Sequence, residues 1–104
     1  MVNRDTYDVL WPLARKAAKS ASLASRLASL DGRTVAFLWD YIFRGDLVFS
    51  RVEARLRERF PGIRFVGYDT FGNIHGRTER EIVAGLGARL RELSCDAVVT
   101  GIGA

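Results

Sequence analysis

The side chain best suited to acid–base chemistry is the single histidine, His75, which stands between Ile74 and Gly76. An imidazole titrates near neutral pH, so His75 at the rim of a binding site would exchange protons with a substrate. The alternative is a loop histidine that hydrogen-bonds a neighbouring carbonyl group. Two aspartates, Asp40 and Asp46, flank an earlier loop, and Asp40 is the better candidate for a polar contact with a ligand.

Further polar side chains occupy the segment that leads to His75, namely Tyr68, Asp69, Thr70 and Asn73. No spacing among them identifies a reaction, so we predict only that they line a substrate site. Thr100, Gly101 and Gly103, close to the last residue, are predicted to join them there.

The only cysteine, Cys95, is not expected to be a nucleophile. It follows a predicted helix, whose C-terminal dipole raises the pKa of a nearby thiol. A lone cysteine forms no internal disulfide, which is typical of a reducing compartment, and we expect a cytoplasmic protein. One histidine and one cysteine are too few for an ordinary structural zinc site, so no metal is expected.

The pair Gly101 and Gly103 follows an apolar run, where a Gly-x-Gly loop lets the backbone approach a ligand. A dinucleotide-binding fingerprint needs a third glycine and stands after the first strand of its domain. The sequence meets neither condition, and it therefore predicts no NAD, no FAD and no other cofactor.

Three apolar runs predict the strands that would position these residues. Residues 34–39 form a continuous apolar run, as expected of a strand buried on both faces of a parallel sheet. Phe37 and Trp39 are therefore expected in the core rather than on a platform that stacks a ligand. Runs at 63–66 and 95–100 predict two more strands.

Two amphipathic segments predict the helices between these strands. Asp46 is the expected N-cap of the first helix, which ends at Pro61-Gly62, and a capping box from Thr78 to Glu81 opens the second. The predicted buried stripes are Val48, Val52, Leu56 and Phe60 in the first helix and Ile82, Val83, Leu86, Leu90 and Leu93 in the second.

The alternation of strands and helices predicts an α/β fold over residues 31–104, a Rossmann-like three-layer arrangement around a partial parallel sheet. Residues 1–30 are expected to form an N-terminal helical segment, because apolar residues recur there at helical spacing. These residues are Tyr7, Leu10, Leu13, Ala14 and Ala17. Within that segment, the small polar stretch 20–25 is either a connector or a short second helix.

Ligands of such sheets bind beyond the carboxyl ends of the strands, near the point where the strand order reverses. Segments 39–46, 68–76 and 100–104 are expected to converge there. Three strands and two helices leave a sheet edge and part of a face uncovered, so we expect a half-domain that is truncated or completed by another chain. The alternative is a compact small domain with a frayed glycine tail.

Two stretches of the chain resemble the UGSC family of proteins and selenoproteins. They are Phe37-Leu38-Trp39-Asp40 with Gly45-Asp46 downstream, and the run from Cys95 to Gly103. The similarity extends roughly from Leu27 to Ala104 and corresponds to the Rossmann-like first part of that family. In its members the Gly-x-Gly is followed almost at once by selenocysteine or cysteine and then Gly-Ser-Cys, and this sequence stops just before that motif.

The resemblance implies thiol or selenol redox chemistry in residues that follow Ala104. The order U-Gly-Ser-Cys has the spacing of a Cys-x-x-Cys redox pair, in which the selenol would attack and the cysteine would resolve. Selenocysteine is encoded by UGA, which is otherwise read as a stop codon. We therefore expect an in-frame UGA directly after Ala104.

Composition excludes several other classes of protein. The 104 residues are 48% hydrophobic and 27% charged, which is typical of a globular chain rather than a disordered one. No apolar run approaches the ~18 residues of a membrane-spanning helix. The formal charge is +4, but acidic residues alternate with arginines in 51–59 and 77–91, as on solvated helix faces, so neither nucleic acid nor a membrane is expected as a partner.

Two functions remain. The first is the amino-terminal portion of a UGSC-family, thiol- or selenol-dependent oxidoreductase that acts on a small-molecule or thiol substrate. The second is a non-catalytic subunit or binding module that completes its sheet with a partner chain or a second copy.

Overall fold

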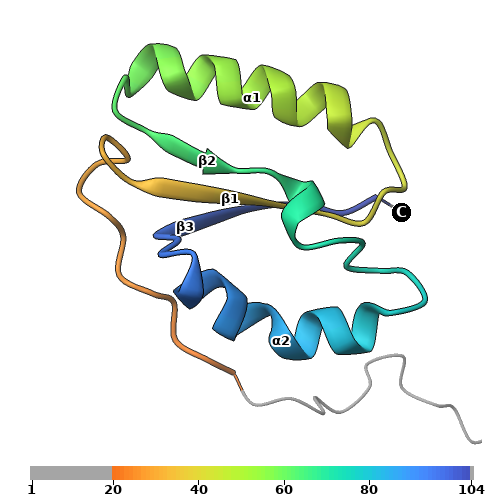
Figure 1. Ribbon diagram of the computed structural model, residues 1–104. Coiled ribbons are helices and arrows are strands. Elements are labelled where there is room, and N and C mark those ends of the chain that lie inside the picture. Colours follow the sequence, from red (N-terminus) through yellow and green to blue (C-terminus); the bar gives the residue numbers. More distant parts are fainter. Residues whose placement is uncertain (1–19, 104) are drawn as a thin grey trace, which may run out of the picture.

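The structure is a computed structural model, and it describes residues 20–103. Its elements, in chain order, are β1 (Thr34–Trp39), α1 (Gly45–Arg59), β2 (Arg64–Val66), the 3-10 helix η1 (Tyr68–Thr70), α2 (Glu79–Glu92) and β3 (Ala97–Gly101) (Figure 1). The three strands form one parallel sheet in the order β2-β1-β3. The predicted α/β fold with a partial parallel sheet is confirmed.

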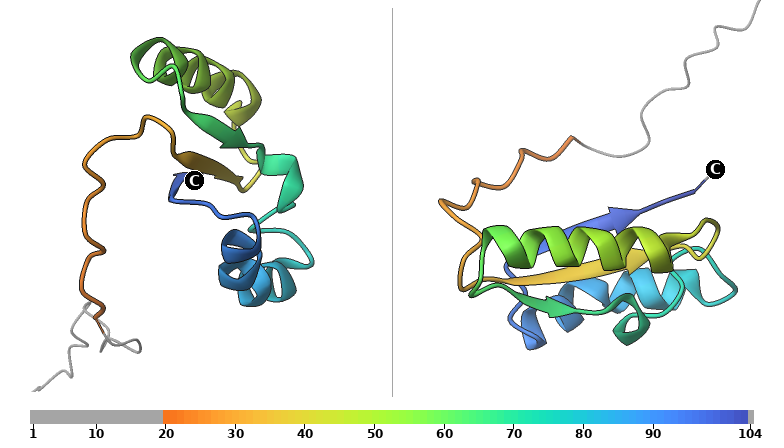
Figure 2. Two further views of the ribbon diagram at one scale, coloured as in Figure 1. Left: turned by 60° about the vertical axis from the view of Figure 1, so that its left-hand side comes forward. Right: turned by 90° about the horizontal axis from the view of Figure 1, so that it is seen from above.

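The central strand β1 is covered on both faces, because α1 and α2 lie on opposite sides of the sheet (Figure 2). All six residues of β1 are buried. Ala36 and Leu38 belong to the cluster on the α2 side, whereas Phe37 and Trp39 pack on the α1 side with Phe49. This double burial explains the unbroken apolar run, and it confirms the core positions predicted for Phe37 and Trp39.

The strand order reverses at β1. The chain leaves β1, forms β2 on one side of it, and then crosses back over β1 to form β3 on the other side. Val35 pairs with Ala97 at one end of β3, and Trp39 pairs with Gly101 at the other. The carboxyl ends of β1 and β3 therefore form the switch point at which ligands of open α/β sheets bind.

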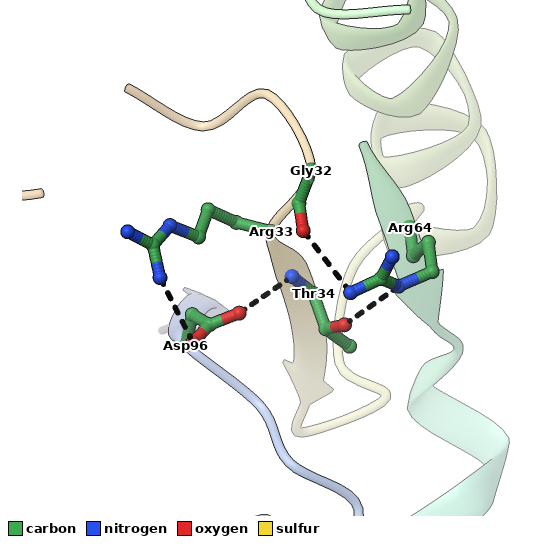
Figure 3. Close-up of polar contacts among 5 residues, drawn as sticks. All are labelled: Gly32, Arg33, Thr34, Arg64 and Asp96. Atoms are coloured by element: carbon green, nitrogen blue, oxygen red, sulfur yellow. Dashed lines mark hydrogen bonds and ion pairs between the residues drawn. The ribbon is translucent and has the colours of Figure 1, made fainter. Parts of the chain in front are cut away.

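A polar clasp holds the opposite, amino-terminal end of the sheet (Figure 3). The Thr34 backbone N–H donates to Asp96 Oδ2 over 2.9 Å, and Arg33 Nη1 lies 3.8 Å from Asp96 Oδ1. Arg64 donates from Nε to Thr34 Oγ1 over 3.2 Å and from Nη2 to the Gly32 carbonyl over 3.0 Å. These contacts fix the register of all three strands at their start.

The N-cap predicted for α1 is wrong, whereas the N-cap predicted for α2 is correct in position but lacks the expected hydrogen bonds. The N-cap position of α1 is Arg44, and Asp46 lies inside the first turn, where it accepts a hydrogen bond from Arg44 Nε over 3.1 Å. The helix begins at Gly45, which packs beneath the Trp39 indole. Only glycine fits there, because a Cβ would lie 2.5 Å from a carbon of the ring. Thr78 is the N-cap residue of α2 but makes no side-chain cap hydrogen bond, so the capping box is absent.

The buried stripes also differ from the prediction by one residue in each helix. In α1, Phe49 is 5% exposed and Val48 is 44% exposed, the reverse of the expected order. The Phe49 ring lies 5.1 Å from the Phe37 ring, so the larger side chain fills the space above the sheet. In α2, Val83 is 53% exposed, whereas the other four predicted residues are half-buried.

Residues 20–30 contain bends and extended chain, so the helix predicted there is wrong and the connector is the alternative that the structure has (Figure 1). Leu23, Leu27 and Leu30 recur at helical spacing, but Leu23 is 94% exposed and Leu27 is 37% exposed, so little packing against the sheet is available to stabilise a helix here. Leu27 and Leu30 approach the start of β3, where they line a pocket with Asp96 and Ala97. The remainder of the predicted N-terminal helix, including Tyr7 and Leu10, lies outside the described residues.

Because Phe49 is buried and Val48 is exposed, truncating each side chain to alanine should lower the free energy of unfolding by different amounts. Phe49→Ala should lower the free energy of unfolding by about 3–5 kcal/mol, because it leaves a cavity against Phe37 and Trp39. Val48→Ala should cost about 0.5 kcal/mol or less, since its side chain is exposed. Urea unfolding of the two variants measures both values, and a larger loss for Val48→Ala would contradict the observed packing.

Candidate functional site

A buried carboxylate, Asp40, lies at the switch point. Asp40 directly follows β1 and is 2% exposed. Its Oδ2 accepts the backbone N–H of Gly103 over 2.7 Å, and its Oδ1 accepts that of Ile42 over 3.2 Å. One side chain thus satisfies amides from the loop after β1 and from the segment after β3, and it fixes these two segments against each other.

The loop after β1 turns sharply at Tyr41, a non-glycine residue with a φ of 63°. The Asp40–Ile42 hydrogen bond closes this turn from one side. From the other side the Tyr41 ring stacks on Trp39, with ring centroids 4.4 Å apart, and Tyr68 meets it edge-on. Burial raises the pKa of the Tyr41 phenol, and Tyr68 and Asp69 raise it further.

The loop that carries His75 is attached to the same end of β1. The Ile74 N–H donates to the Trp39 carbonyl over 3.3 Å. The His75 N–H donates to Asn73 Oδ1 over 2.9 Å, and the imidazole Nδ1 lies 2.9 Å from Glu79 Oε2. The loop is therefore held by β1, and the imidazole by the first residue of α2.

These contacts enclose a pocket of about 160 Å³. It is lined by Asp40, Ile74, His75, Ile102 and Gly103. The predicted convergence of the three segments at the carboxyl ends of the strands is thus observed. The pocket is smaller than the ~300 Å³ or more of a drug-sized ligand site, and its volume suits a single side chain or a small polar ligand.

Other residues predicted for the site lie outside this pocket. Tyr68 packs against Trp39 on the α1 face of the sheet, with ring centroids 4.9 Å apart. Asp69 and Thr70 are exposed on η1, and Thr100 is exposed on β3. Asn73 does not line the pocket but fixes the backbone of His75.

The glycine pair has a packing role that the sequence did not indicate. A Cβ on Gly101 would lie 2.6 Å from Phe49 Cζ, and one on Gly103 would lie 3.1 Å from Ile42 Cβ. Glycine at these positions lets side chains of the α1 layer close over the end of β3. The Gly-x-Gly spacing is therefore explained by packing, without a bound ligand.

Cys95 lies at the other end of the sheet, just before β3, where it packs against the α2 cluster. Burial raises the pKa of its thiol, and the neighbouring carboxylate of Asp96 adds to the effect. The expected direction is confirmed, but the main cause is loss of water rather than the helix dipole.

Sequence reasoning missed Glu79 and Tyr41. The signal for Glu79 was its position four residues after His75, which becomes meaningful only once α2 is known to begin there. For Tyr41 there was no signal, because a positive φ at a tyrosine follows from tertiary contacts.

Comparison with known proteins gives one match. The model of the UGSC family matches residues 8–104, nearly the whole chain. No curated protein and no solved structure matches. Within residues 20–103, no helix combines the length and apolar content needed to cross a membrane.

Removing the Asp40 carboxylate should be costly. Asp40→Ala leaves the amides of Ile42 and Gly103 without their acceptor, and we expect a loss of about 2–4 kcal/mol in the free energy of unfolding. Hydrogen exchange at the Gly103 amide should also become faster. Asp69→Ala, which removes an exposed carboxylate at the same end of the sheet, is the matched control and should cost about 0.5 kcal/mol or less. Equal losses in the two variants would contradict the role given to Asp40.

The thiol of Cys95 should react slowly. Because its raised pKa leaves less thiolate at neutral pH, iodoacetamide should alkylate the folded chain more slowly than the chain unfolded in urea. The raised pKa also means that the thiol form stabilises the fold at neutral pH and that this contribution is lost as the pH rises through the pKa of the folded state. Mass spectrometry follows the alkylation, and a folded chain that reacts faster than the unfolded one would make Cys95 an activated nucleophile.

Proposed function

The chain belongs to the UGSC family, and from this premise we propose that it is the amino-terminal portion of a thiol- or selenol-dependent oxidoreductase whose redox motif follows Ala104. The 104 residues then form half of a Rossmann-like, doubly wound domain in a reducing, cytoplasmic setting. Their role is to build the pocket beside which the reactive residue stands.

The position of Gly103 at the pocket supports this proposal most strongly. Asp40 holds the Gly103 amide at the pocket that His75 also lines. A residue directly after Ala104 is two steps from Gly103, within about 7–8 Å of it along the backbone. A selenocysteine or cysteine at that position would thus lie within this distance of Gly103, which lines the pocket together with Asp40 and His75.

The uncovered side of β3 is a second support. Val98 and Thr100 pair with Ala36 and Leu38, so their side chains point to the α2 face of the sheet. Val98 is 39% exposed, because α2 packs over β1 and β2 and not over β3.

A continued doubly wound sheet would cover that face. The crossover from β2 to β3 carries α2 over one face of the sheet. A fourth strand added at the free edge of β3 would continue the sheet in the same direction. The right-handed crossover rule then puts the next helix on the α2 face, directly over Val98. The exposed valine is thus where a following β–α unit would need an apolar contact.

With a disulfide substrate, the selenol–thiol pair of the family motif would act as a two-electron reductant. The selenolate attacks one sulfur and releases the first thiol, and the cysteine of the Gly-Ser-Cys sequence then attacks the selenium–sulfur bond. The second thiol leaves as the pair closes to a selenenyl sulfide. Two electrons pass from the pair to the substrate, and a separate thiol reductant restores the pair.

The rival function, a non-catalytic subunit that completes its sheet with a partner chain, is favoured by the same open edge of β3. It differs in what covers Val98. In the rival function a neighbour-encoded protein co-purifies with the 104-residue chain, whereas the redox protein carries the cover in its own polypeptide.

The nucleotide sequence after the Ala104 codon separates these functions. We expect an in-frame TGA, or a cysteine codon, followed by codons for Gly-Ser-Cys and by enough further sequence for another β–α unit. Any other continuation overturns the redox proposal for this chain. If a different continuation is found, and a partner that carries the rest of the sheet co-purifies with the chain, the subunit function is supported instead.

A further inference from the structure

The imidazole of His75 and the carboxylate of Glu79 meet at the rim of the pocket, with Nδ1 2.9 Å from Oε2. We propose that these two residues form a carboxylate–imidazole dyad, in which Glu79 accepts the Nδ1 hydrogen and leaves Nε2 as the proton acceptor at the pocket. The inference rests on the proposed redox function only for the identity of the group that gives up its proton.

His75 has polar neighbours on both its backbone and its ring. The backbone N–H of His75 donates to Asn73 Oδ1 over 2.9 Å, which sets the start of the turn. Glu79, the first residue of α2, then reaches back four positions to the ring. The backbone and the imidazole of His75 thus have different polar neighbours, Asn73 and Glu79.

The partners determine which nitrogen carries the hydrogen. A neutral imidazole has one N–H donor and one acceptor nitrogen, and an ionised carboxylate only accepts. With Nδ1 2.9 Å from Oε2, a hydrogen on Nδ1 faces the carboxylate favourably, whereas a lone pair on Nδ1 would face a negatively charged oxygen. The lone pair of Nε2 remains available.

Stability is not the reason for this contact. The side chains of His75 and Glu79 are 66% and 47% exposed, so water screens their attraction and the pair adds little to the fold. What it supplies is orientation. Asp40, the other ionisable residue that lines the pocket, has both carboxylate oxygens occupied by the amides of Ile42 and Gly103.

In the proposed protein the dyad would generate a thiolate. Nε2 takes the proton of a thiol that lies at the pocket, so an S–H bond breaks, an N–H bond forms and the sulfur keeps the electron pair. The imidazolium that results is stabilised by Glu79. His75 is then the catalytic base and Glu79 is a positioning residue.

The presence of one histidine in the sequence makes the test direct, because every imidazole signal comes from His75. Two-bond ¹H–¹⁵N spectra of the 104-residue chain distinguish the two tautomers at a pH where the ring is neutral. We expect the Nδ1–H tautomer to predominate in the folded chain. In urea the ring should return to the Nε2–H tautomer that free imidazoles of histidine prefer.

Three variants complete the test. Glu79→Ala should shift the folded chain to the Nε2–H tautomer, and Glu79→Gln should keep the Nδ1–H tautomer because its amide oxygen still accepts. Glu81→Ala, which removes an exposed carboxylate from the same turn, should change nothing. An Nε2–H tautomer in the unaltered chain, or an Nδ1–H tautomer that persists in Glu79→Ala, would overturn the dyad. Neither result bears on the codons after Ala104, so failure of the dyad and failure of the redox proposal are separate outcomes.

Discussion

Aspartate carboxylates accept backbone hydrogen bonds between the β1 and β3 segments at both ends of the strand pair. At the amino-terminal end, Asp96, which precedes β3, accepts the backbone N–H of Thr34 at the start of β1. At the carboxyl end, Asp40, which follows β1, accepts the backbone N–H of Gly103 beyond β3. Because a parallel pair has no hairpin to set its register, these two crossed contacts supply that constraint. The pocket and the position of Gly103 both depend on the second of these contacts.

The general arrangement of the fold could be predicted from the sequence, because its signals are local. The apolar run 34–39 marks a doubly buried strand, and two amphipathic segments between strands imply a parallel sheet. Side-chain details escaped because they depend on contacts between layers. Phe49 rather than Val48 faces the sheet because of the rings beneath it. Gly45 allows α1 to start before Asp46 because the Trp39 indole occupies the place of a Cβ.

The location of the candidate site could be predicted from the sequence, but not all of its lining residues. The carboxyl ends of parallel strands lie at one edge of the sheet, and this rule predicts that Asp40, His75 and Gly103 are neighbours, as they are in the pocket. It could not separate residues that line the pocket from those that only share its end of the sheet, such as Tyr68 and Thr100. It also could not assign Gly101 to packing, since the Phe49 ring that needs the space comes from a helix about fifty residues earlier in the chain.

The proposed function places the reactive group beside a pocket that is already fixed by Asp40 and β1. The measurement that tests this most directly is the intact mass and selenium content of the protein isolated from its own source. The account predicts a polypeptide substantially longer than 104 residues that contains one selenium atom, or a cysteine in its place, directly after Ala104. A 104-residue polypeptide that is a folded monomer with neither selenium nor a partner chain would contradict it.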